Sequence, residues 1–170
     1  LHTQKLDESE TKELERVVFA SRNIMNSIKN FKGIRYDFDE FDSSENEYMN
    51  SRYKLFRRRL VEIYHDMNRI LELATKEEQY RELLKAFVHI EETDKRFIRE
   101  TMDAVSANMI HDMEIASLLL VNRLFTQACR LQVFGVKDLL LSPEQINDFD
   151  RAMDVKDILD EEKAKTTEKK

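Results

Sequence analysis

Apolar residues recur at intervals of three and four positions along most of this chain, and this spacing constrains the fold more than any other feature. Such spacing places apolar side chains on one face of an α-helix, because the helix has about 3.6 residues per turn. The chain has 2 glycines and 1 proline in 170 residues, too few for the tight turns of a strand-rich sandwich or barrel. The spacing therefore predicts an all-α fold made of a few long helices.

The periodic segments predict four long helices and a short one. We place the long helices near 7–32, from Ser43 or Ser44 to 74, from Thr75 to 105 and at 113–141, with a loop at 34–43. Ser142 and Pro143 are typical of a helix start, so the short helix is expected to run from there to about Leu159. Short connections favour an antiparallel up-down-up-down bundle. We expect one domain over 1–160 and a disordered, charged tail over 161–170.

The predicted helices differ in how clearly their buried faces can be assigned. In the first helix we expect a core-facing stripe of Leu14, Val17, Ser21, Ile24, Ile28 and Phe31, widened by Val18 and Met25, with Gly33 as a left-handed cap. Glu91 and Asp94 interrupt the stripe of the third helix, so either that helix changes phase or a carboxylate is partly buried. The segment 113–141 is apolar on more than one face, and it should be the most buried helix and still offer apolar surface to a partner.

Net charge, cysteine content and hydropathy limit the partners and the cellular compartment that we expect for this chain. A formal net charge of −6 opposes phosphate backbones, so nucleic acid is not an expected partner. The single cysteine, Cys129, excludes an internal disulfide and suits a reducing compartment such as the cytoplasm. No segment approaches the roughly 20 apolar residues of a membrane span. The chain opens with Leu1 and not with Met, so we expect it to be a fragment of a longer protein.

No arrangement of residues in the sequence predicts catalysis. His89, His111 and Cys129 do not fall into a nucleophile, base and orienter pattern, and no glycine-rich loop is present to hold phosphate. We therefore expect a protein that is not an enzyme and that has no cofactor.

The acidic residues of the third predicted helix are either metal ligands or ordinary solvated carboxylates. Glu91 and Asp94, with Glu92 beside them and His65 and Asp66 on the preceding helix, supply ligand types that divalent metals accept. His65 and Asp66 lie off the main apolar seam, and no Glu-x-x-His pair occurs. We expect no metal, and we keep Glu91 and Asp94 as the weak candidates.

The candidates for contact with a partner are a run of basic residues on the second predicted helix and one asparagine in the most apolar helix. Arg52, Arg57, Arg58 and Arg59 belong to a basic run that is either a solvated helix face or a contact for anionic lipid headgroups or an acidic partner. Asn122 lies in the most apolar helix, where it either pairs across the bundle and fixes helix register or faces a partner.

Two segments resemble a known family. These are MEIASLLLVNRLFTQACRLQVFGVKDLLL at 113–141 and LERVVFASRNIMNSIKNFKGI at 14–34. They are similar to the PhoU-like cytoplasmic C-terminal domain of bacterial sodium/phosphate cotransporter-related proteins, and the order of helices matches over about 7–141. Stand-alone PhoU proteins hold iron or zinc on acidic motifs. The residues after Glu15 are Arg16, Val17, Val18, Phe19 and Ala20, so that motif is missing and the metal site is not carried over.

The resemblance implies a cytoplasmic domain of an inner-membrane protein that controls sodium-coupled phosphate movement. Our leading hypothesis is a non-catalytic regulatory domain that contacts the transmembrane transport domain of its own chain or a neighbouring copy. The first alternative is a metal-binding, phosphate-responsive regulator that uses Glu91 and Asp94. The second is a structural dimerisation module, in which a homodimer forms without any effect on transport.

Overall fold

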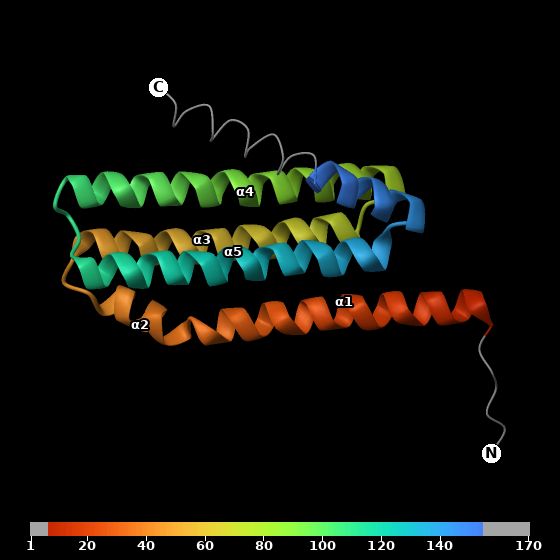
Figure 1. Cartoon of the computed structure of the whole chain (residues 1–170), viewed down its shortest axis with the longest axis horizontal. Coiled ribbons are helices and arrows are strands. Elements are labelled where there is room, and N and C mark those ends of the chain that lie inside the picture. Colours follow the sequence, from red (N-terminus) through yellow and green to blue (C-terminus); the bar gives the residue numbers. More distant parts are fainter. Residues whose placement is uncertain (1–6, 155–170) are drawn as a thin grey trace, which may run out of the picture.

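The computed structural model describes residues 7–154, and within this range the chain is helical and has no strand. The long helices are α1 (Glu8–Gly33), α3 (Glu47–Leu71), α4 (Lys76–Ser106) and α5 (Asp112–Leu140), and the short α2 (Arg35–Ser43) follows α1. Residues 143–154 are helical as well. The long helices lie side by side, and the α3–α4 and α4–α5 connections are at opposite ends of the bundle (Figure 1). The prediction of an all-α helical bundle is confirmed.

Side-chain caps set the first residue of three long helices. Asp7 and Glu10 exchange hydrogen bonds at the start of α1, and Thr75 accepts a hydrogen bond from the Glu78 amide at the start of α4, where a cap was predicted. The predicted cap at Ser43 or Ser44 is wrong. Asn46 caps α3 by accepting a hydrogen bond from the Tyr48 amide at 2.9 Å, so α3 begins later than expected.

The segment 34–43 is not a loop, as was predicted, but contains helix α2. Its aromatic residues account for the difference, since Phe41 is buried and Phe38 packs against the core from the same side of the short helix. The predicted left-handed cap at Gly33 is also wrong. Gly33 is the last residue of α1 and has no positive φ, while the fully buried Ile34 occupies the C-cap position.

The core is centred on α5, which packs against α1, α3 and α4. At its centre Phe125 is fully buried, with its ring 5.4 Å from that of Phe31 and 5.1 Å from that of Phe56, centroid to centroid. The prediction that this is the most buried helix is confirmed, since α5 has more buried residues than α1, α2, α3 or α4. Little of the apolar surface that it was expected to offer to a partner remains, since only Met113, Leu120 and Leu139 are large apolar residues of α5 that stay exposed.

The helical residues 143–154 cover one end of the bundle. Phe149 is fully buried there, and the buried Lys137 donates a hydrogen bond to Asp150 at 2.6 Å. The predicted helix end at Leu159 and the predicted tail at 161–170 lie outside the described residues. Within the described range, none of the helices combines the length and the apolar character that crossing a membrane would require.

Candidate functional site

Helix α1 turns a different face to the bundle from the one that its apolar stripe predicted. Ala20 and Ser27 are fully buried against α5, whereas Leu14, Val17 and Ile28 are 52%, 46% and 53% exposed. Ser21, from the same predicted stripe, is exposed too, and Ile24 and Phe31 are partly buried. The prediction is therefore wrong for most of the stripe.

Small residues on both helices explain this orientation. The Ser27 hydroxyl donates a hydrogen bond to the Ala128 carbonyl oxygen at 2.8 Å. At Gly135 an added Cβ would lie 2.5 Å from the Cδ1 atom of Ile24, closer than real Cβ contacts. Because α5 presents glycine and alanine here, the two backbones approach closely, and the side of α1 that carries Ala20 and Ser27 fits against α5.

The apolar stripe consequently forms an exposed surface, which we call the outer face of α1. It consists of Leu14, Val17, Val18, Ser21, Met25 and Ile28. Val18 and Met25 are 52% and 60% exposed, and an open hollow runs along the face between Val17 and Lys29. The outer face is turned away from Ala20 and Ser27, with Val18 and Met25 farthest from them around the helix, and α1 is at the edge of the bundle beside α5 (Figure 1). No other described element covers it.

Several polar side chains pair inside the bundle between α3, α4 and α5. The Arg59 guanidinium donates a hydrogen bond to the side-chain oxygen of Asn122 at 3.2 Å, and the Asn122 amide group donates to Asp94 at 2.6 Å. Asp94 also accepts a hydrogen bond from the Thr126 hydroxyl at 3.0 Å. Arg59 lies 4.9 Å above the Phe125 ring. Burial lowers the pKa of Arg59 from its ordinary value, and the charge of Asp94 acts in the opposite direction.

This network changes the interpretation of two partner-facing candidates. Arg59 is 7% exposed and Asn122 is 2% exposed, so both belong to the interior and neither meets a partner at the surface. For Asn122 the structure supports the alternative in which the amide pairs across the bundle. Because Asp94 is partly buried and α4 is continuous, the interruption of its apolar stripe is a partly buried carboxylate and not a change of phase.

The rest of the basic run is divided between several local contacts. Arg52 forms an ion pair with Glu100 at 2.6 Å and stacks on Tyr48, which leaves its side chain 17% exposed. Arg57 and Arg58 are exposed, and Arg57 lies over the Tyr53 ring. The four arginines thus do not form one continuous basic face.

The metal-site candidates are engaged with hydrogen-bond donors. Glu91 accepts two hydrogen bonds from Arg130 in a bidentate pair, and Asp94 accepts from Asn122 and Thr126. His65 is exposed on α3. Among residues 7–154, no group of three or more histidine, cysteine, aspartate or glutamate side chains is placed to hold a metal ion.

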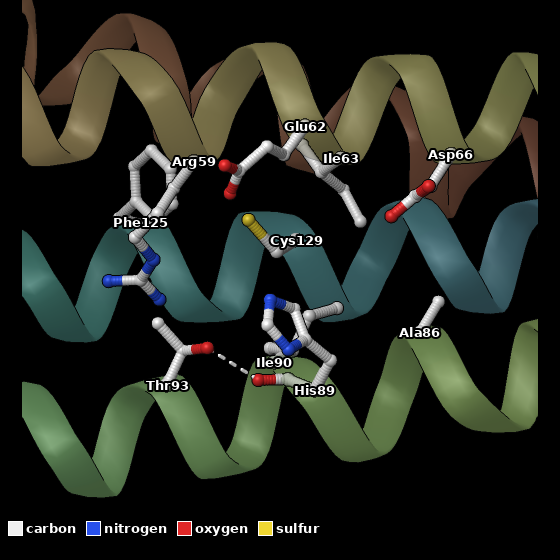
Figure 2. Close-up of a pocket in the computed structure, with 10 residues that line it drawn as sticks. All are labelled: Arg59, Glu62, Ile63, Asp66, Ala86, His89, Ile90, Thr93, Phe125 and Cys129. Carbon is white, nitrogen blue, oxygen red and sulfur yellow. Dashed lines mark hydrogen bonds between the residues drawn. The ribbon is translucent and has the colours of Figure 1, made fainter.

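A small cavity between α3, α4 and α5 is lined in part by acidic, histidine and cysteine side chains (Figure 2). Its lining includes Asp66, His89 and Cys129, and its volume of about 30 Å³ is enough for one or two water molecules. Burial raises the pKa of the Cys129 thiol to about 12, and the nearby Arg59 opposes this shift only in part. At neutral pH the thiol is therefore protonated and a poor nucleophile.

Cys129 is expected to resist alkylation in the folded protein. Its thiol pKa of about 12 compares with 9.0 for an unperturbed thiol. The thiolate fraction at pH 8 is then about a thousand-fold lower than in the unfolded chain, and burial slows the reaction further. Labelling with iodoacetamide, followed by intact mass spectrometry in native buffer and in urea, measures the difference. Equal labelling rates in the two conditions would contradict this assignment.

The sequence analysis missed the outer face of α1, although a second set of positions at the same spacing was present. Ala20, Ile24, Ser27 and Phe31 recur at intervals of four, three and four, and this set shares Ile24 and Phe31 with the predicted apolar stripe. Because Ala20 and Ser27 are small or polar, this side of the helix resembles a solvent-exposed face in the sequence. The pairing of small residues with Gly135 and Ala128 on α5 was the available signal.

Comparisons of the chain with protein-family models, curated proteins and solved structures find no significant match.

Proposed function

We propose that this chain is a non-catalytic regulatory domain that acts by docking through the outer face of α1. The observation that carries the proposal is the row of half-exposed side chains at Leu14, Val17, Val18, Met25 and Ile28. A contiguous apolar strip on a helix marks a contact surface, because a soluble domain gains nothing by exposing it to water. Helix-to-helix docking uses such a strip, with anchors spaced three and four residues apart.

The wider setting follows from the family resemblance of segments 14–34 and 113–141. In that setting the chain is a cytoplasmic domain of a sodium-dependent phosphate cotransporter-related membrane protein. The docking partner is then the transport region of the same parent chain or a neighbouring copy. Docking changes the transport rate if the outer face of α1 binds one conformation of the transport region more tightly than another.

The energetic scale of docking is set by the apolar area that it would cover. Each of the five side chains is about half exposed. Complete burial of such a side chain contributes about 1.5–3 kcal/mol, so half of this value, or roughly 1 kcal/mol each, is available on docking. Introducing charge into the strip removes this contribution and adds the penalty of desolvating a carboxylate.

The test replaces Val18 and Met25 with glutamate in the parent protein and measures sodium-dependent phosphate uptake. We expect uptake to change to the level seen when residues 7–154 are deleted, with equal amounts of protein in the membrane. Val61→Glu is the matched control, since Val61 is 69% exposed on α3 and lies away from the outer face of α1. It should leave uptake unchanged. If deleting the domain alters uptake and the α1 variant does not, this face is not the docking surface.

A further inference from the structure

We propose that the outer face of α1 binds the same face of a second copy of this chain, with the two α1 helices antiparallel. This inference rests on the proposed function, because it names the partner of the same docking surface. It is supported by the spacing of the exposed residues, by the distribution of charge along α1 and by a register that satisfies both.

The exposed residues follow the repeat of a coiled-coil seam. Leu14, Val18, Ser21, Met25 and Ile28 are separated by four, three, four and three positions. This is the alternation of the a and d positions in a heptad, in which Val18 and Met25 take position a and the other three take position d. The four apolar members are each more than half exposed, so the seam is available to a partner.

Charge is segregated along the same helix. Residues 8–15 contain four glutamates and one lysine, whereas residues 16–33 contain four basic residues and no acidic one. Two parallel copies would place glutamates beside glutamates and basic residues beside basic residues. Two antiparallel copies place the acidic half of each helix beside the basic half of the other. The charge pattern therefore selects the antiparallel arrangement of two identical helices.

One antiparallel register satisfies both patterns over nearly the whole of α1. It places Leu14 opposite the partner's Met25 and Val18 opposite the partner's Ser21, which is the a-to-d pairing of antiparallel coiled coils. In the same register, the e positions that flank the seam bring Glu15 beside the partner's Arg22 and Glu8 beside the partner's Lys29. All four of these charged side chains are exposed in the single chain. The twofold axis repeats each pair, so four oppositely charged pairs line the interface.

A seam of one helix against one helix is a small interface, so the association should be weak and dependent on concentration. Because exposed charge pairs contribute to it, added salt should weaken it. Sedimentation velocity from about 1 to about 100 µM should show the mass rising from monomer to dimer, with a lower dimer fraction in high salt.

Charge exchange tests the register directly. We expect Glu15→Arg to raise the dimer dissociation constant about tenfold, because it creates two like-charge contacts. Adding Arg22→Glu to the same chain should restore dimerisation, since the pairs are then re-formed with reversed sign. Glu45→Arg is the matched control, because Glu45 is exposed outside α1 and should not affect the dissociation constant. If the double exchange remains as weak as the single one, the register is wrong.

Disulfide trapping separates antiparallel from parallel pairing. In a Cys129→Ala background, Leu14→Cys protein mixed with Met25→Cys protein should cross-link on mild oxidation, while each variant alone should not. Cross-linking of Leu14→Cys alone would establish parallel pairing and overturn the proposal. A chain that stays monomeric at every concentration and forms no cross-link overturns it too. If the Val18 and Met25 glutamate variant still alters uptake in that case, the proposed function stands with a different partner.

Discussion

Replacing Phe125 with alanine is expected to lower the free energy of unfolding by about 3–5 kcal/mol. Phe125 is fully buried on α5, and its ring contacts those of Phe31, Phe38 and Phe56 from three other helices. The truncation removes a large apolar side chain at the point where these helices meet and leaves a cavity that the rigid neighbouring rings cannot fill. Urea denaturation followed by circular dichroism at 222 nm measures the loss.

Phe19→Ala provides the matched control for this prediction. Phe19 lies on α1 and is 54% exposed, so the same chemical change there should alter the free energy of unfolding by less than about 0.5 kcal/mol. Phe125→Leu should lie between the two, because leucine fills part of the space. A loss for Phe125→Ala no larger than that for Phe19→Ala would show that the ring cluster is not the centre of the core.

Asp94→Ala is expected to destabilise the protein by about 2–4 kcal/mol, although its side chain is only partly buried. Asp94 is the acceptor for Asn122 and Thr126, and through Asn122 it balances the charge of the buried Arg59. Without the carboxylate, the network keeps its positive charge and loses its terminal acceptor. Thermal and urea unfolding of the variant measure the loss.

A double-mutant cycle shows whether the loss comes from the uncompensated charge. Arg59→Met replaces the buried guanidinium, which lies over the Phe125 ring, with a shorter, uncharged and flexible apolar chain. The variant that carries both changes should be more stable than Asp94→Ala alone. If the two losses simply add, Arg59 and Asp94 are not coupled and the network is a set of independent contacts.

The sequence identified most of the helices because their existence depends on local features. The three-four spacing, the scarcity of glycine and proline, and the Thr75 cap act over a few residues, so a single sequence displays them. Helix α2 was missed because its local features are weak. Its acidic and aromatic residues alternate in a short segment that lacks strong helix preference, and it is stabilised by the packing of Phe38 and Phe41 against other helices.

The buried network shows a different limit of sequence analysis. Arg59 sits in a run of arginines, and local composition predicts a solvated face for all of them. Only the neighbouring helices decide that Arg59 turns inward while Arg57 and Arg58 stay exposed, because Asn122 on α5 and Asp94 on α4 supply the compensating partners. Those three residues are far apart in sequence, and no spacing rule relates them.

The outer face of α1 was placed in the core for a related reason. A helix with two stripes at the same period offers both to its neighbours, and the larger apolar stripe is the usual choice. Here α5 presents Gly135 and Ala128, so the stripe of Ala20 and Ser27 achieves the closer approach.

The sequence by itself thus determined that this protein is all helical and where most of its helices run, since these properties depend on neighbours along the chain. Only the tertiary structure decided which side of α1 is free, because that choice depends on how closely two helix backbones can approach.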